Sequence, residues 1–224
     1  MNQFFTGMVK ASQMVYVLYT RLSSGLTFES YLSYFSMLPS SLRQENLRYL
    51  QWDDKFRNVA GKILLMKGIC ELGLEASELE NIRYDEYKRP FLSSGIDFNI
   101  AHSGSYVLCA ISKEIRVGID IEEIRPVNFE DFVGVMTEAQ WDRIKRHRRP
   151  LKAFYSYWSM KESVMKADGR GMEIPLDTIS ITGNSVTCGQ HEWFLKKLDI
   201  NDGYAAWLAT NCNKTTIALK YIHF

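Results

Sequence analysis

The stretch Val117-Gly118-Ile119-Asp120-Ile121-Glu122 guides the interpretation of the whole chain, because its alternating composition predicts a β-strand. On a strand, residues two apart point to the same face about 6.6 Å apart, so Asp120 and Glu122 share one face. Like charges this close repel each other unless a cation joins them, and Mg²⁺ is commonly held by one or two carboxylates together with substrate phosphates. The stretch predicts either a metal site that needs a third ligand or an edge strand with a solvated acidic face.

The bulk composition is that of an ordinary soluble globular protein. The chain has 224 residues, of which 46% are hydrophobic and 24% charged, enough for one large domain or two small ones. A net charge of +1 gives no overall field that would recruit nucleic acid or an acidic membrane. The cysteines have no close metal-ligand spacing, and we find neither a signal peptide nor an apolar run of about 18 residues. We therefore expect a reduced, cytoplasmic protein that binds neither membrane nor nucleic acid.

The order of strand and helix patterns predicts an α+β fold made of two pseudo-symmetric halves. In each half a strand precedes a long helix and a hairpin follows it. We expect half-domains of residues 1–113 and 114–224, each an antiparallel sheet packed with a long helix. The predicted elements are strands at 14–20, 117–122 and 217–222, helices at 28–38, 53–72 and 151–168, and hairpins at 97–111 and 199–210.

Residue spacings support an internal duplication of this kind. Lys62 lies 99 residues before Lys161, and Lys67 lies 99 residues before Lys166. Gly104 and Gly203 keep the same spacing, as do Ala110 and Ala209, while the two opening strands are 102 residues apart.

The duplication sets the acidic residues of the second half against neutral residues of the first. A requirement of the shared scaffold would affect both copies, so acid in one copy points to a site added to that copy. The corresponding pairs are Asp120 and Leu18, Glu122 and Thr20, and Glu162 and Ile63.

Glu162 occupies an unusual place on the helix expected at 151–168. The apolar stripe runs through Leu151, Tyr155, Trp158 and Met165, and steps of three and four put Glu162 on it. A carboxylate that faces a core costs several kcal/mol unless it is paired or metal-bound. Glu162 is therefore a candidate third ligand for the metal. The alternative is a salt bridge to the lysine one turn further on, which contributes only a few tenths of a kcal/mol when exposed.

Several cations could accompany such a site. Lys166 lies one turn beyond the glutamate on the same face and could neutralise charge on a transferring group, although a lone helix lysine is usually solvated. Lys161 points about 100° away round the helix and is the weaker candidate. His102, in a hairpin turn, could donate to a phosphate, but a lone turn histidine is more often a surface residue. Arg57 and Arg89 are further possible phosphate contacts.

Two segments together resemble the paired signature of the 4′-phosphopantetheinyl transferases. They are the VGIDIE strand at 117–122 and the FYSYWSMKESVMKADGRG segment at 154–171, which match that family's strand and its W-x-x-K-E-S-x-x-K helix. The segments FNIAHSG at 98–104 and KRP at 88–90 are similar to two upstream motifs of the family. The resemblance runs from about 48 to 210, and the duplicated halves fit the larger, monomeric Sfp-type branch.

The resemblance implies a reaction and roles for its residues. Coenzyme A would donate its 4′-phosphopantetheine arm to a serine of a carrier protein, and 3′,5′-ADP would leave. Asp120, Glu122 and Glu162 would hold Mg²⁺, or Mn²⁺ in its place, against the pyrophosphate. Glu162 would also take the proton of the carrier serine, and Lys166 would stabilise charge on the phosphates.

The implied contacts with coenzyme A depart from the family pattern in places. His102 and Arg89 would bind its phosphates, and Arg57 would lie near the 3′-phosphate. Ala101 stands where the family usually has serine, and an arginine at 89 stands where lysine is common, which changes the geometry of the charge. Arg43 matches a basic N-terminal contact only loosely.

The partner implied by the family is a small acidic helical carrier protein, in fatty-acid, polyketide, peptide or siderophore synthesis. We expect it to dock on the basic run 143–149 and on apolar residues of 129–136. Two alternatives stay open: a Mg-dependent phosphotransferase that acts on a small molecule, and a catalytically idle module that binds coenzyme A or a carrier.

Overall fold

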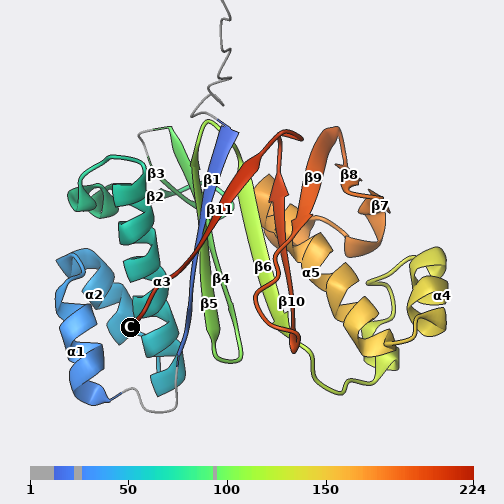
Figure 1. Cartoon of the computed structure of the whole chain (residues 1–224), viewed down its shortest axis with the longest axis horizontal. Helices are drawn as coiled ribbons and strands as arrows, with labels where there is room; N and C mark the ends of the chain where they lie inside the picture. The colour runs from blue at the N-terminus through green and yellow to red at the C-terminus, as the bar shows by residue number, and fades with distance from the viewer. Residues whose placement is uncertain (1–12, 23–26, 93–94) are drawn as a thin grey trace, which may run out of the picture.

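The computed structural model describes residues 13–22, 27–92 and 95–224. It confirms the predicted α+β fold: two sheets lie face to face in the middle, with helices on both outer sides (Figure 1). Across the ranges just given, no helix is long and apolar enough to cross a membrane.

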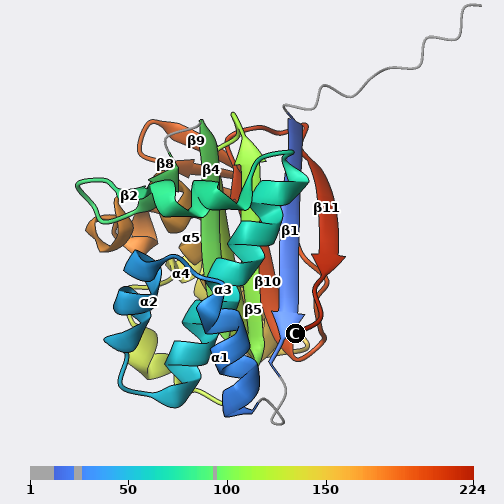
Figure 2. The same cartoon turned by 90° about the vertical axis from the view of Figure 1, so that its left-hand side faces the viewer.

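The first sheet has the strand order β11-β1-β5-β4. Its strands are β1 (Met14–Arg21), β4 (Ile96–Ser103), β5 (Tyr106–Lys113) and β11 (Thr216–Tyr221). The last strand of the chain thus joins the sheet of the first half, where it pairs parallel to β1. Figure 2 shows the helices that cover the outer face of this sheet, α1 (Phe28–Ser36), α2 (Ser40–Leu47) and α3 (Trp52–Glu71). Beyond α3 come the 3-10 helix η2 (Ala76–Asn81) and the hairpin of β2 (Ile82–Tyr84) and β3 (Pro90–Leu92).

The second sheet has the order β6-β10-β9-β8-β7. Its strands are β6 (Val117–Glu123), β7 (Ser180–Thr182), β8 (Ser185–Cys188), β9 (His191–Lys197) and β10 (Tyr204–Thr210). Helix α5 (Pro150–Asp168) covers its outer face, and α4 (Glu138–Arg146) packs beside α5. Short 3-10 helices occur at η3 (Phe129–Phe132), η4 (Gly171–Glu173) and η5 (Leu176–Thr178).

Strand β6 separates its side chains as the alternation predicts. Ile119 and Ile121 join a buried cluster between the two sheets, which also contains Val17 and Leu108 of the first sheet. The opposite face of β6 turns toward α5, where Asp120 meets a lysine of that helix. The acidic face is therefore covered by a helix, and the alternative of a solvated edge strand is wrong for Asp120, which is 3% exposed.

Gly118 lets α5 lie directly on β6. A Cβ atom at this position would lie 2.1 Å from the backbone oxygen of Ser163 and 2.3 Å from the backbone nitrogen of Ala167. Only glycine permits this approach, because backbone atoms cannot move aside as a flexible side chain can. The close contact brings the carboxylates of β6 within reach of the polar residues of α5.

The two halves share a scaffold, but one predicted correspondence fails. The helices α3 and α5 have 20 and 19 residues, and each carries a buried lysine, Lys62 in α3 and Lys161 in α5. Ala110, however, faces the core between the sheets, whereas Ala209 faces α5. The spacing of 99 residues is therefore wrong for this strand pair, because equivalent positions of a repeated scaffold must face the same side, and successive residues of a strand face opposite sides.

Candidate active site

The site lies along the seam where β4 of the first half meets β6 of the second. These strands belong to different sheets, and side chains of β4 take the place of a backbone ladder. Alternate residues of β4 accept hydrogen bonds from alternate N–H groups of β6. The donor–acceptor pairs are Val117 N to Asp97 Oδ2 (2.7 Å), Ile119 N to Asn99 Oδ1 (2.9 Å) and Glu123 N to Ser103 Oγ (3.0 Å). The seam fixes the register of the carboxylate strand against the first half.

One position in this row carries no acceptor. Ala101 lies between Asn99 and Ser103 on the same face of β4, opposite Ile121 of β6. Its methyl group cannot accept a hydrogen bond. The serine that the family usually has there would supply a hydroxyl at this step of the row.

Asp120 is the most buried carboxylate of the site. One oxygen, Oδ1, accepts a hydrogen bond from Lys166 Nζ at 2.6 Å. The other oxygen, Oδ2, is buried and has no partner among the residues that the structure describes. A buried anionic oxygen without a partner is costly, so this atom is the clearest sign that a cation belongs beside it.

The two glutamates lie in the electrostatic field of Asp120. Burial raises the pKa of Glu122, and the charge of Asp120 raises it further. Ser103 Oγ donates to Glu122 Oε2 at 2.9 Å and opposes this shift. Burial likewise raises the pKa of Glu162, with Lys166 opposing and Asp120 adding to the shift. The crowded carboxylates favour a positive charge between them.

Lys166 supplies one such charge. Burial alone would lower the pKa of this ammonium, but Asp120, Glu162 and Glu122 outweigh burial and raise it. Within the ranges described, no three acidic, histidine or cysteine side chains already form a metal cage. The hard oxygen donors and the unpartnered Asp120 oxygen nevertheless fit Mg²⁺, which takes the rest of its ligands from phosphates and water.

Arg89 is held mainly by the protein itself. Its guanidinium makes a bidentate pair with Asp97 at 2.6 and 2.7 Å, and it donates to the backbone oxygens of Lys166 and Val117 at 3.0 Å each. Four of its five N–H groups are thus engaged. It still borders a cavity of about 260 Å³ that Tyr87, Asn99, Glu162 and Lys166 also line. Asp97 therefore neutralises much of the charge that a phosphate would use.

The other predicted basic residues lie in different places. His102 is exposed near the end of β4, and partial desolvation of its ring, together with Arg57 and Lys166, lowers its pKa. Arg57, on α3, donates to the backbone oxygen of Gly104 at 3.2 Å and pairs with Asp54 at 3.2 Å. Arg43 lies on α2, and within the described part of the chain it forms no hydrogen bond or ion pair with the carboxylates.

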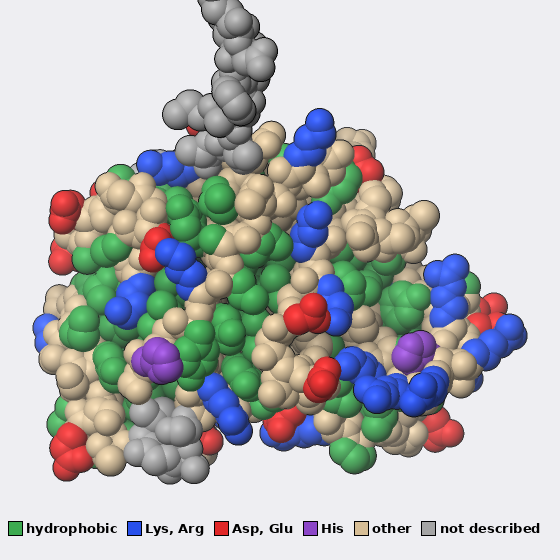
Figure 3. Space-filling model, in the orientation of Figure 1, with side chains coloured by type: hydrophobic (Ala, Val, Ile, Leu, Met, Phe, Trp, Pro, Cys, Tyr) green, Lys and Arg blue, Asp and Glu red, His purple; other side chains and the backbone are tan. Residues whose placement is uncertain are grey.

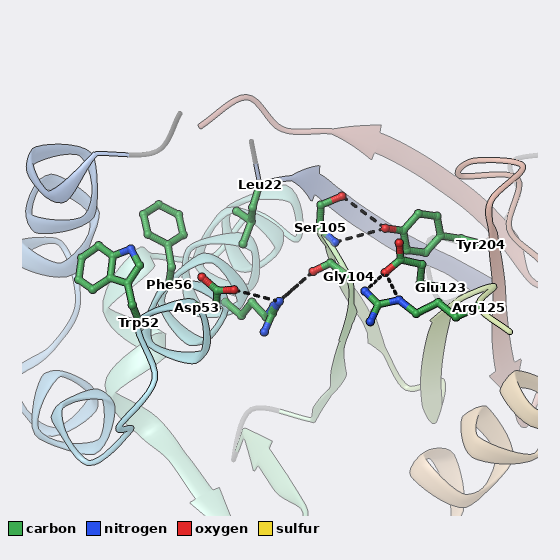
Figure 4. A pocket seen from close by; sticks show the side chains of 10 residues that line it. Leu22, Trp52, Asp53, Phe56, Gly104, Ser105, Glu123, Arg125 and Tyr204 are labelled. Carbon is green, nitrogen blue, oxygen red and sulfur yellow. Dashed lines mark hydrogen bonds and ion pairs between the residues drawn. The ribbon is translucent and has the colours of Figure 1, made fainter. Parts of the chain in front are cut away.

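A second cavity, of about 450 Å³, adjoins the seam at the tip of the β4–β5 hairpin (Figure 4). Trp52 and Phe56 form an aromatic wall on one side, and Tyr204 reaches across to Ser105 on the other. Arg125 pairs with Glu123, the residue next to the carboxylate Glu122. Cavities thus adjoin the seam at the tip of the β4–β5 hairpin and beside Glu162 and Lys166.

Comparison with known proteins identifies the family. A model described as the 4′-phosphopantetheinyl transferase superfamily matches residues 116–211. The chain is 33% identical to the 4′-phosphopantetheinyl transferase gsp of Aneurinibacillus migulanus over 67% of this chain and 65% of that protein. It is 30% identical to 4′-phosphopantetheinyl transferase Sfp of Bacillus subtilis over 66% of this chain and 67% of Sfp. The chain belongs to the 4′-phosphopantetheinyl transferase family.

The match covers 65% of the length of gsp, just under two thirds, and 67% of the length of Sfp. Among solved structures, the holo-[acyl-carrier-protein] synthase of Thermotoga maritima aligns with a TM-score of 0.37 and 18% identity, over 43% of this chain and 62% of that one. The matched region of the family model includes β6, α5 and β10, and thus all three carboxylates of the site in this transferase-family chain.

Sequence reasoning missed two features of the site. The first is the row of polar residues on β4, whose signal is the alternation of Asp97, Asn99 and Ser103 on one strand face. The second is Lys161, which we ranked below Lys166 and which is completely buried. Its correspondence with a lysine in the first half was visible, but a helix lysine is ordinarily solvated.

Proposed function

We propose that this chain transfers the 4′-phosphopantetheine arm of coenzyme A to a serine of a carrier protein and releases 3′,5′-ADP. The observation that carries the proposal is Asp120, buried with one oxygen on Lys166 and the other unpartnered, in a member of this transferase family. Because β4 of one half and β6 and α5 of the other build the site together, we propose that a monomer is the active form.

The reaction forms one bond and breaks one at phosphorus. The carrier serine oxygen bonds to the phosphorus that bears the pantetheine arm, and the bond from that phosphorus to the bridging oxygen breaks, so that 3′,5′-ADP leaves. Glu162 accepts the serine proton, since its raised pKa makes the carboxylate a better base. Lys166 stays protonated and stabilises the charge on the leaving oxygen.

Asp120, Glu122 and Glu162 would hold the metal ion, and when bound Mg²⁺ would neutralise charge on the pyrophosphate. Ser103 orients Glu122 through its hydrogen bond, and Asp120 orients Lys166. The protein thus supplies position and charge rather than a covalent intermediate, as phosphoryl-type transfer requires.

We propose that the carrier docks beside α4. The residues of 143–149 are exposed except Ile144, and Figure 3 shows Lys and Arg side chains gathered on the side where Figure 1 places α4. Of the apolar residues in 129–136, Phe129, Phe132 and Met136 pack around Phe154. Val133, at 83% exposure, is the apolar side chain left for a partner.

The test is the mass of a purified carrier domain after incubation with coenzyme A and Mg²⁺. The proposal predicts a gain of one phosphopantetheine group, and Ser→Ala at the modified carrier serine should abolish it. If coenzyme A binds but no carrier in a panel gains mass, the chain is a binding module. Transfer to a small molecule with the carrier unchanged would instead support the phosphotransferase alternative.

A further inference from the structure

Lys161 is a completely buried ammonium on the helix that carries Glu162. Its side chain is 0% exposed, yet no carboxylate lies within salt-bridge distance of it in the described part of the chain. Nζ donates instead to two backbone oxygens, Val135 O and Leu176 O, at 2.8 Å each. Burial lowers the pKa of Lys161 to about 8, and the charge of Asp177 opposes this shift without forming an ion pair. Burying a charge outside an ion pair is expensive, so a purely structural position would more economically carry an apolar residue.

The two acceptors belong to two segments that are far apart in the sequence. Val135 follows η3 and lies two residues from Val133, in the segment where we place carrier docking. Leu176 opens η5, five residues after Gly171, which lines the cavity beside Glu162. One ammonium therefore ties both loops to the turn of α5 that presents the candidate base.

The first half contains a matched lysine with different partners. Lys62 of α3 is 7% exposed, and its Nζ lies 3.8 Å from Glu45 Oε1 on α2. Its charge is balanced by a carboxylate, and it joins two helices. Lys161 is buried as well, but hydrogen bonds to two loop carbonyls take the place of an ion pair, and Asp177 acts on it only at longer range. The difference coincides with the half that carries the carboxylate site.

We propose that Lys161 is a positioning residue, which holds the Val133–Val135 segment at a fixed distance from Glu162 so that a docked carrier presents its serine to that carboxylate. The proposal rests on the proposed function. Without the ammonium, the carbonyls of Val135 and Leu176 lose a charged donor and the docking segment loosens. Carrier binding then suffers, whereas coenzyme A, held at the seam, does not depend on the segment.

The decisive variants are Lys161→Met and Lys161→Gln, with Lys62→Met as the matched control. We expect kcat/KM for the carrier to fall by about tenfold or more in both Lys161 variants, chiefly through KM, with coenzyme A affinity within about twofold of the parent. Amide hydrogen exchange of 133–136 should accelerate in the same variants. Lys62→Met should leave carrier KM and the exchange of 133–136 unchanged.

Other results would overturn the proposal. They are an unchanged carrier KM in a folded Lys161 variant, an equal loss of coenzyme A binding, or an equal effect of Lys62→Met. If both Lys161 variants fail to fold, the carrier KM of Val133→Ser in the parent protein tests the proposal instead. An unaltered carrier KM would show that the carrier does not dock on this segment. If the parent modifies no carrier, the proposed function fails, and hydrogen exchange of 133–136 in Lys161→Gln tests the anchoring alone.

Discussion

The two halves of this molecule place the same kind of helix on the same kind of strand and fill the contact differently. In the first half, Leu18 of β1 and Ile63 of α3 are both completely buried in one apolar cluster. At the corresponding positions of the second half stand Asp120 and Glu162. The first half shows that the scaffold packs well without these carboxylates, whose burial in the second half costs free energy. This contrast supports the proposal that the second half carries them for chemistry.

The hydrogen bonds show the cost of replacing these apolar residues by carboxylates. The first half needs no cation between β1 and α3, whereas the second places Lys166 against Asp120 and still leaves Asp120 Oδ2 unpartnered among the described residues. A site that is incompletely satisfied without its substrate is common where binding and catalysis are concentrated. The comparison makes the first half an internal control for every substitution in the second.

The largest contrast should come from removing the candidate base. We expect Glu162→Gln to lower the carrier transfer rate by about 10³-fold, because the amide cannot accept the serine proton. The melting temperature should stay the same or rise, since a crowded buried charge is lost. The matched substitution Ile63→Val should cost about 1 kcal/mol of stability and leave the transfer rate unchanged. Steady-state kinetics and thermal unfolding measure both.

The next effect concerns how closely each helix approaches its sheet. We expect Gly118→Ala to cost about 3 kcal/mol in the free energy of unfolding, because its Cβ would meet backbone atoms of α5. In the first half, a Cβ at Gly68 would lie 2.7 Å from Ile111 Cγ2, so a buried side chain rather than backbone would have to shift. Gly68→Ala should cost less than Gly118→Ala, because the strain falls on a side chain and about 1 kcal/mol of helix propensity offsets part of it. Equal losses in urea unfolding would contradict this reason for the glycine at 118.

A third prediction addresses the metal. Mg²⁺ together with coenzyme A should stabilise the parent protein by about 2.7 kcal/mol when ligand is present at about 100 times Kd. Asp120→Asn should lose most of the Mg²⁺-dependent part, since a neutral amide attracts the ion far less. Thermal unfolding with and without Mg²⁺ measures this. A Mg²⁺ effect of the same size in the variant would rule out Asp120 as a ligand.

The smallest expected effect tests the seam. Ala101→Ser should add about 1 kcal/mol of stability by offering an acceptor opposite Ile121, while Ser103→Ala should remove about as much. Ala110→Ser, in the core between the sheets, should destabilise because it buries a hydroxyl there. Chemical denaturation of the three variants provides the ranking. If Ala101→Ser destabilises the protein, the N–H of Ile121 does not need an acceptor at position 101.

Local patterns were sufficient for much of the fold. Alternation predicted β6, turn signals predicted the β4–β5 hairpin, and Pro150 and the left-handed Gly169 bound α5. The hairpin predicted at 199–210 was right in its turn and its second strand, but its first strand lies earlier, at β9. The short strands β2, β3 and β8 were not predicted, and two further features were missed for clear reasons. Strand β11 was predicted, but its parallel pairing with β1 across nearly the whole chain was not, because no local pattern reveals it. Helix α2 is short and polar and buries only Leu42 and Asn46, so it lacks a readable apolar stripe.

The site was predicted unevenly for a physical reason. The three carboxylates were conspicuous in the sequence because they interrupt an apolar strand and stripe, and the structure brings them together around Lys166. The predicted stripe itself was inaccurate, since Tyr155 and Trp158 are half-buried and α5 meets β6 through Ser163 and Ala167 instead. The engagement of Arg89 by Asp97 was not predictable, because it depends on how two distant segments meet in space.

The central claim is that the second half carries a transferase site absent from the first. The most direct test is the intact mass of a carrier domain incubated with coenzyme A, Mg²⁺ and either the parent protein, Glu162→Gln or Ile63→Val. The account predicts phosphopantetheine on the carrier with the parent and with Ile63→Val, and unmodified carrier with Glu162→Gln over the same time. Equal modification by all three proteins would contradict it.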